Sequence, residues 1–174
     1  GRELGSGGSA AARHQMLVPY DADGSLLPES GLGALGAYLR HPVRRRHLMR
    51  RTCVERKPWY AFHETPPMRD MRRPKILCKD IAAEPCFVID RAGTVIPRHS
   101  LYYLVPSDPG QIDDLCAYLN SADVADFLRA HCQRAANGYL RLQSHVLKSV
   151  PLLEGLGGHR AGRERSVAVA GLDV

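Results

Sequence analysis

Residues 86–105 read CFVIDRAGTVIPRHSLYYLV, and this stretch decides the fold. Its two ends, 86–90 and 101–105, are rich in β-branched and aromatic residues, which is typical of β-strands. Between them, Arg91-Ala92-Gly93 is a turn signal, and the short β-branched run Thr94-Val95-Ile96 follows at once. We therefore expect residues 86–90 and 94–96 to form a β-hairpin and residues 101–105 to form the next strand of an antiparallel sheet.

The flanking segments predict helices after the sheet and a mixture before it. Apolar residues recur at helical spacing over 112–119, where Asp108 and Pro109 suit the start of a helix, and Ser121 can cap a second one. Asn137-Gly138 breaks the chain before another ordered segment. Upstream, we expect short strands at 16–20, 59–62 and 75–78, and a helix over 31–51 that Pro42 divides.

These elements indicate an α+β fold: an N-terminal helix, a mostly antiparallel β-sheet with a hairpin, and C-terminal helices packed on the sheet. We expect a flexible lead-in over 1–15, one recognition domain over 16–154 and a disordered tail over 155–174. No apolar run is long enough to span a bilayer, and the first residues lack the apolar core of a secretory signal. The sequence therefore favours a cytoplasmic protein without a membrane partner.

Positive charge is concentrated in one part of the chain. Residues 40–79 hold 13 Lys or Arg and three acids, a net +10 in a chain whose total is +6, so the remainder is net −4. Such asymmetry is typical of a face that meets a polyanion, although solvated Arg-rich helices look the same. Trp59 lies beside Lys57 and either stacks on bases or anchors the core; we favour the core position.

The sequence gives little indication of a nucleotide-binding, metal or catalytic site. The string at 31–36 fits G-x-G-x-x-G, but no strand precedes it, so we do not expect nucleotide binding there. The five cysteines are odd in number and form no C-x-x-C pair, which indicates buried reduced thiols and no metal site. We find no catalytic constellation and expect no catalytic residues.

Six short motifs, in this order, resemble the C-terminal target recognition domain of bacterial adenine-specific DNA methyltransferases. They cover about residues 17–152. They are Pro19-Tyr20-Asp21 with Asp23-Gly24, Arg56-Lys57-Pro58-Trp59-Tyr60, Pro74 to Ile81 (PKILCKDI), Phe87 to Asp90 with Gly93, Leu119-Asn120-Ser121, and Gly138 to Gln143 (GYLRLQ) with Val150-Pro151.

The resemblance implies a domain that reads DNA sequence for an enzyme of a restriction-modification or phage-defence system. In that family an upstream catalytic domain binds S-adenosylmethionine and carries an N-P-P-Y or D-P-P-Y motif. The nearest string here, Thr65-Pro66-Pro67-Met68, lacks both the acid or amide and the aromatic residue. We therefore expect no catalysis and no cofactor from this fragment alone, and we expect its partners to be double-stranded DNA and the catalytic domain of the same chain.

Candidate DNA-binding residues divide by the kind of contact they suit. Cations contact phosphates and give affinity, whereas side chains with two hydrogen-bonding atoms read bases. For phosphates we select Arg44, Arg45, Arg51, Lys75 and Lys79; for bases we select Arg98, His99, Arg141 and Gln143; and we add Tyr139 beside them.

Two other binding modules remain open. The DNA-reading half of a type I restriction specificity subunit has a related but looser pattern, and a long helix after Pro151 would support it; the Gly-rich residues 155–174 do not look like one. A basic module that binds RNA or a protein is the less favoured alternative. Nothing in the sequence supports a stand-alone enzyme.

Overall fold

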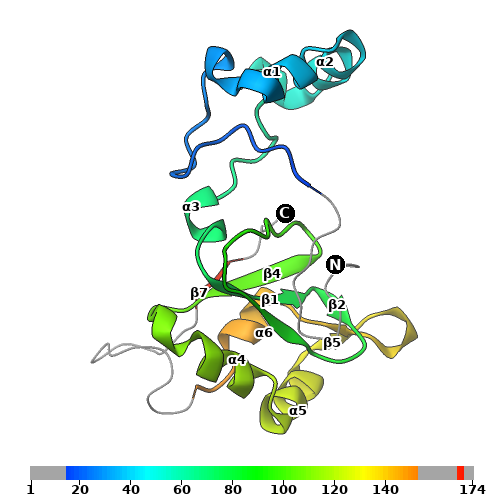
Figure 1. Cartoon of the computed structure of the whole chain (residues 1–174). Helices are drawn as coiled ribbons and strands as arrows, with labels where there is room; N and C mark the ends of the chain where they lie inside the picture. Colours follow the sequence, from blue (N-terminus) through cyan, green and yellow to red (C-terminus); the bar gives the residue numbers. More distant parts are fainter. Residues whose placement is uncertain (1–14, 153–167, 171–174) are drawn as a thin grey trace. The chain divides into compact units, whose positions relative to one another are not determined.

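Residues 15–152 and 168–170 are described by the computed structural model, in which the chain separates into two units (Figure 1). The N-terminal unit comprises residues 15–70, and the C-terminal unit comprises the described residues from 71 onward. The expected single domain over 16–154 is thus divided, with the short helix α3 (Met68–Met71) at the boundary. The expected lead-in lies outside the described residues except for Gln15.

The N-terminal unit is built from short helices. They are the 3-10 helix η1 (Glu29–Leu32), α1 (Gly33–Leu39), α2 (Pro42–Met49) and the 3-10 helix η2 (Thr52–Glu55). Pro42 occupies the first position of α2, where its missing N–H costs nothing, so the expected helix is divided as predicted. The string Gly31 to Gly36 lies on η1 and α1 and follows the extended residue Pro28.

Trp59 and Tyr60 anchor this unit. Both are buried against Leu32, and partly buried leucines of α1 and α2 surround them. The indole Nε1 of Trp59 donates to Glu29 at 3.1 Å, and the Tyr60 hydroxyl donates to the carbonyl of Leu27 at 2.8 Å. The core position expected for Trp59 is therefore confirmed.

Two expected strands of this unit are absent. Residues 59–62 form turns and bends, because the buried rings of Trp59 and Tyr60 take their polar partners from the segment 27–29 and no neighbouring strand pairs with them. Of residues 16–20, only Tyr20 makes a β-bridge, with Leu26 across the turn at Asp21. That turn is as predicted, since the Asp21 carboxylate accepts from the backbone of Asp23 and Ser25.

The C-terminal unit contains a four-stranded antiparallel sheet in the order β3-β1-β4-β7. Its strands are β1 (Lys75–Lys79), β3 (Phe87–Asp90), β4 (Leu101–Val105) and β7 (Ala168–Ala170). β7 lies within the segment expected to be disordered, so for its three residues that expectation is wrong; the rest of 155–174 lies outside the described residues.

The prediction of a hairpin over 86–96 is wrong, because its two strands do not pair with each other. β3 pairs with β1, not with residues 94–96, which form no strand. The reason is the side chain of Asp90, which accepts hydrogen bonds from the backbone N–H groups of Thr94 (3.2 Å) and Val95 (2.9 Å). These are donors that a second hairpin strand would have used, so the segment becomes a loop.

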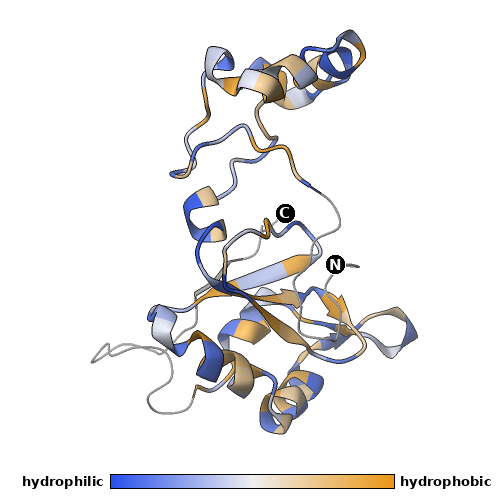
Figure 2. Ribbon diagram, in the orientation of Figure 1, coloured by the Kyte–Doolittle hydropathy of each residue, from blue (hydrophilic) through white to orange (hydrophobic). Residues whose placement is uncertain are grey.

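Three helices cover one face of the larger sheet: α4 (Ile112–Leu119), α5 (Ala122–His131) and α6 (Ser144–Lys148) (Figure 1). Their apolar sides and the strand residues Ile76, Cys78, Phe87 and Leu104 form one core. Figure 2 shows both hydrophobic and hydrophilic residues on α4 and α5, as expected of helices with one buried side. The α+β fold with C-terminal helices packed on an antiparallel sheet is confirmed.

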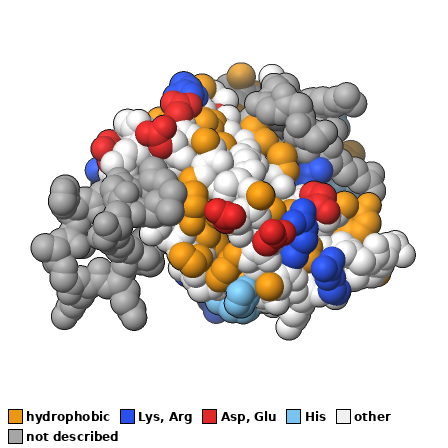
Figure 3. Space-filling view, turned by 90° about the horizontal axis from the view of Figure 1, so that it is seen from below, with side chains coloured by type: hydrophobic (Ala, Val, Ile, Leu, Met, Phe, Trp, Pro, Cys, Tyr) orange, Lys and Arg blue, Asp and Glu red, His pale blue; other side chains and the backbone are white. Residues whose placement is uncertain are grey.

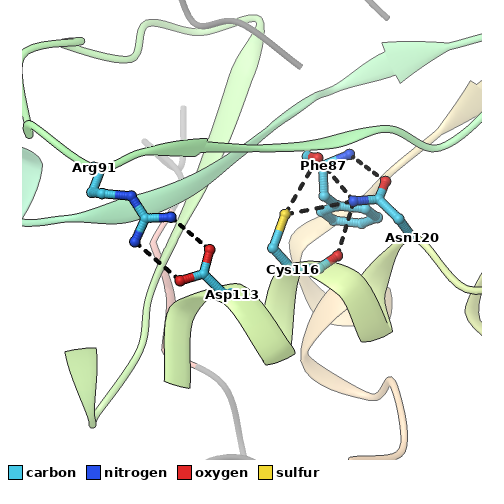
Figure 4. A network of polar contacts seen from close by, with 5 residues as sticks. All are labelled: Phe87, Arg91, Asp113, Cys116 and Asn120. Atoms are coloured by element: carbon cyan, nitrogen blue, oxygen red, sulfur yellow. Dashed lines mark hydrogen bonds and ion pairs between the residues drawn. The ribbon is translucent and has the colours of Figure 1, made fainter. Parts of the chain in front are cut away.

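Polar contacts attach α4 to β3 at both ends of the helix (Figure 4). The guanidinium of Arg91 binds the carboxylate of Asp113 with two hydrogen bonds of 3.1 and 2.5 Å. At the other end, Asn120 accepts from the backbone N–H of Phe87 at 3.0 Å and donates to its carbonyl at 2.9 Å. Asn120 thereby occupies the open edge of β3.

A second, three-stranded sheet has the order β2-β6-β5. Its strands are β2 (Ile81–Ala82), β5 (Gln133–Arg134) and β6 (Leu140–Arg141), each two residues long, and the 3-10 helix η4 (Ala136–Gly138) joins the last two. This hairpin projects from the unit (Figure 1). Asn137 (φ 61°) and Gly138 (φ 76°) adopt left-handed conformations there, in agreement with the break expected at these residues.

Candidate nucleic-acid interface

Several of the cations in the chain are already paired and are therefore poor candidates for phosphate binding. Lys75 is fully buried and forms an ion pair with Asp90, so its assignment as a phosphate contact is wrong. Arg51 is half-buried and donates to two carbonyls, that of Leu48 at 3.2 Å and that of Trp59 at 2.6 Å. We attribute to Arg51 a role in holding the N-terminal unit together.

The helix α2 presents a basic surface. None of its residues is buried, and it contains Arg44, Arg45 and Arg46 with no acidic residue. Arg44 lies over the ring of Tyr38, 3.8 Å from its centroid, and Arg45 lies 5.5 Å from the ring centre of Trp59. Such cation–π contacts orient the guanidinium groups over the rings, and both arginine side chains remain exposed. Arg44, Arg45 and Arg46 are all exposed, and their contact with phosphate stays a prediction.

In the C-terminal unit, the backbone of Asp80 brings three predicted segments together. Its N–H donates to the carbonyl of Ser100 at 3.0 Å, and its carbonyl accepts from the N–H of Leu142 at 2.7 Å. Asp80 also follows Lys79, the last residue of β1. We call the surface around it the Asp80 junction and define it by the predicted residues Lys79, Arg98, His99, Arg141 and Gln143.

These side chains are available for binding to different degrees. Arg98, His99 and Arg141 are exposed, whereas Lys79 and Gln143 are half-buried. Arg98 and His99 lie in a turn that a 2.7 Å hydrogen bond from Leu101 to the carbonyl of Arg98 closes. Tyr139 is 42% exposed and lies on the β5–β6 hairpin, two residues before Arg141. Four of the five junction residues carry cationic or imidazole groups. The half-buried Asp80 is acidic, so with three Lys or Arg the surface keeps a net positive charge, which suits an anionic ligand.

The three-stranded sheet adds two residues that the sequence did not single out. Ile81 and Gln133 lie directly opposite Arg141 on its two neighbouring strands. Both are exposed. The sequence signal was weak because each of these strands has only two residues, too few for an alternating pattern to be seen.

The helix side of the C-terminal unit has a different character. Seen from below, it carries acidic and basic side chains among apolar ones (Figure 3). Arg129 there binds both Glu84 and Asp126 at 2.6 Å, and Arg91 binds Asp113. By contrast, residues 132–143, which form the β5–β6 hairpin and its flanks, contain two arginines and no Asp or Glu. The hairpin side of this unit therefore suits a polyanion better than the helix side.

Other kinds of site find little support. Among the described residues, no group of three or more His, Cys, Asp or Glu is arranged to hold a metal ion. The five cysteines are free thiols, four of them buried, as the sequence predicted. No described helix has the length and apolarity needed to cross a membrane.

The chain is similar to a known family of domains and to two curated proteins. The family model of the TaqI-like C-terminal specificity domain matches residues 39–152. The Type II methyltransferase M.PaeR7I of Pseudomonas aeruginosa is 31% identical over 137 residues, which are 78% of this chain and 23% of that protein. The Type II methyltransferase M.BstVI of Geobacillus stearothermophilus is 24% identical over 152 residues, 86% of this chain and 26% of that protein.

The chain thus spans about a quarter of the length of these curated relatives. No solved structure matches it significantly. The matched family region contains α2, the Asp80 junction and the β5–β6 hairpin, but not the Pro19-Tyr20-Asp21 motif.

Proposed function

This chain belongs to the family of TaqI-like C-terminal specificity domains, and we propose that it reads DNA sequence for an S-adenosylmethionine-dependent adenine methyltransferase. Methyl transfer and cofactor binding would belong to another domain of the same polypeptide, and the complete enzyme would act on double-stranded DNA in the cytoplasm. A restriction-modification system fits the Type II methyltransferases that the chain resembles. A phage-defence system of another kind is compatible with the same surfaces.

The observation that carries this proposal is the Asp80 junction. It gathers Lys79, the Arg98–His99 turn and the segment of Arg141 around one backbone residue, although Lys79 and Arg141 lie 62 residues apart in the sequence. No acidic side chain among the described residues pairs with Arg98 or Arg141 in a salt bridge. Exposed cations without such partners gain the most from binding phosphate or a guanine base.

The two basic surfaces would have different roles. The three arginines of α2 follow one another on an exposed helix with no acidic residue, so they would hold the phosphate backbone and set affinity and register. The junction combines cations with imidazole and amide groups, which have the donor and acceptor atoms that base edges require.

A salt titration tests the electrostatic part. Binding of this chain to a fluorescent DNA duplex, measured by anisotropy between 50 and 300 mM NaCl, should weaken with a log–log slope of about −0.9 for each phosphate neutralised. The triple variant R44Q/R45Q/R46Q should reduce the magnitude of that slope by about 1 to 3. The control R91Q removes an arginine that binds Asp113 on the helix side and should leave the slope unchanged.

Three outcomes separate the alternatives. A slope near zero for the unmodified chain would contradict phosphate binding at either surface. Stronger binding to single-stranded RNA than to duplex DNA would favour a basic RNA-binding module. Sequence-specific methylation that requires a separately encoded methylase subunit would favour the type I specificity reading over a fused enzyme.

A further inference from the structure

The three-stranded sheet places one side chain from each of its strands in a single row. Arg141 on the central strand β6 pairs with Ile81 on β2 and with Gln133 on β5. Residues directly opposite in antiparallel strands project from the same face, so Ile81, Arg141 and Gln133 share one face. We call these three residues the β6 row.

That face is open, whereas the other face is buried. Ile81 is 41% exposed, and Arg141 and Gln133 are also exposed. The adjacent pair Ala82 and Leu140 points the other way and is buried, with Leu140 in the main core. The sheet is therefore anchored on one face and presents the β6 row on the other.

The composition of the row favours a nucleic-acid base edge over a protein surface. It consists of one guanidinium, one primary amide and one aliphatic side chain. Gln133 and Arg141 lie within residues 127–153, which contain no Asp or Glu, whereas Ile81 directly follows Asp80. Among the described residues, neither Arg141 nor Gln133 has a recorded hydrogen bond or ion pair through its side chain. Their donors and acceptors thus remain available to a ligand.

The dimensions of the row fit the major groove of B-DNA. Neighbouring strands lie about 4.8 Å apart, so three strands place the outer side chains about 10 Å apart. The major groove is about 12 Å wide and admits a two-stranded β-ribbon such as the β5–β6 hairpin, whereas the minor groove, at about 6 Å, is too narrow.

Hydrogen bonds within the β5–β6 hairpin, which carries Gln133 and Arg141, close its loop. The N–H of Ala135 donates to the carbonyl of Tyr139 at 2.7 Å, and the guanidinium of Arg134 donates to the carbonyl of Gly138 at 3.2 Å. These contacts close the loop around the left-handed residues Asn137 and Gly138. A preorganised ribbon loses less conformational entropy when it binds, which favours its use as a reading element.

We propose that the β6 row enters the major groove and reads consecutive bases. Arg141 binds O6 and N7 of a guanine, Gln133 binds N6 and N7 of an adenine, and Ile81 contacts the methyl group of a thymine. Gln133 and Ile81 are thereby specificity residues in addition to Arg141. The inference rests on the proposed function, because it names the element through which the chain would read DNA.

The test uses the complete parent methyltransferase and S-adenosylmethionine. The enzyme methylates a library of duplexes with randomised sequence, and sequencing of the methylated products gives the preference at each position. Q133A should reduce adenine discrimination at one position by about 5- to 150-fold and leave other positions unchanged. R141A should do the same for guanine at a nearby position, and R91A, an arginine on the helix side, should change no preference.

A second variant distinguishes reading from a loss of structure. In Q133E the carboxylate can only accept, so the preference at that same position should move from adenine to cytosine, whose N4 amine donates. A misfolded hairpin would lower methylation but would not create a new preference.

The possible failures are distinguishable. If Q133A, Q133E and R141A leave every preference unchanged, or lower methylation equally for all sequences, the β6 row does not read bases and the inference is overturned. If the unmodified enzyme itself methylates duplexes without sequence preference, the proposed function fails first.

Discussion

Lys75 and Asp90 lie directly opposite each other on β1 and β3 and form an ion pair that is shielded from solvent. The same Asp90 carboxylate accepts the N–H groups of Thr94 and Val95, so it ties the sheet to the loop that leads to Arg98 and His99. Burial lowers the pKa of Lys75, and the hydrogen bond and charge of Asp90 oppose this shift without cancelling it. Removing both charges from water is unfavourable, and the ion pair and hydrogen bond between Lys75 and Asp90 offset that cost.

Replacing Lys75 by Met should destabilise the chain strongly. The substitution leaves the Asp90 carboxylate buried without its cation, a loss of about 3 to 5 kcal/mol in the free energy of unfolding. Urea unfolding followed by circular dichroism measures it. K148M, which removes an exposed lysine from α6, serves as the control and should cost less than about 0.5 kcal/mol. Equal unfolding midpoints for the two variants would show that the buried pair is not a determinant of stability.

Gly93 occupies a position where any side chain would clash with the backbone. Its φ is +65°, and a Cβ there would lie 2.0 Å from the backbone oxygen of Arg72. G93A should therefore cost roughly 3 kcal/mol or more, because backbone on both sides must move. G138A has a similar φ of +76° but open space around the added carbon, so it should cost only about 1 to 2 kcal/mol. Thermal unfolding of both variants checks the difference, and a G138A loss as large as that of G93A would assign the effect to φ alone.

The elements predicted best from sequence are those with local causes. The helices α4 and α5 follow from apolar spacing and from local caps. Ser121 caps α5 by accepting from Val124, and Asp108 accepts from Gly110 at the start of the short 3-10 helix (Pro109–Gln111) that leads into α4. The division at Pro42 follows from the chemistry of proline. Each of these depends on residues a few positions apart, which a single sequence displays.

Strand pairing and the site depend on distant residues, and there the sequence was a poorer guide. The loop over 94–96 exists because Asp90 takes its N–H groups, and the Asp80 junction exists because Ser100 and Leu142 bond to one residue. The motifs that carry the family resemblance are structural in part: Lys75, Asp90 and Gly93 shape the loop and do not face a ligand. This explains why Lys75 looked like a phosphate contact when only its charge was visible.

Asn120, from the Leu-Asn-Ser motif, substitutes for a missing neighbour strand at the edge of β3 (Figure 4). N120A removes the acceptor of the Phe87 N–H and the donor to its carbonyl, which should cost about 1 to 3 kcal/mol. Hydrogen exchange of the Phe87 amide, followed by NMR, should accelerate more than that of other β3 amides. N137G changes an exposed asparagine with positive φ and should leave the Phe87 amide as protected as before. An unchanged exchange rate of the Phe87 amide in N120A would contradict the role of Asn120 at the edge of β3.

Cysteine reactivity reports on the packing of the same region. Cys78 is fully buried, and burial raises the pKa of its thiol far above the ordinary range. Burial also raises the pKa of Cys116 and Cys132, whereas Cys86 is partly exposed. Because the thiolate is the reactive form, iodoacetamide under native conditions should modify Cys86 first and spare Cys78 until guanidinium unfolds the chain. Mass spectrometry of the digested protein measures this order. Modification of Cys78 as fast as Cys86 in the native chain would mean that β1 opens far more readily than its place in the middle of the core implies.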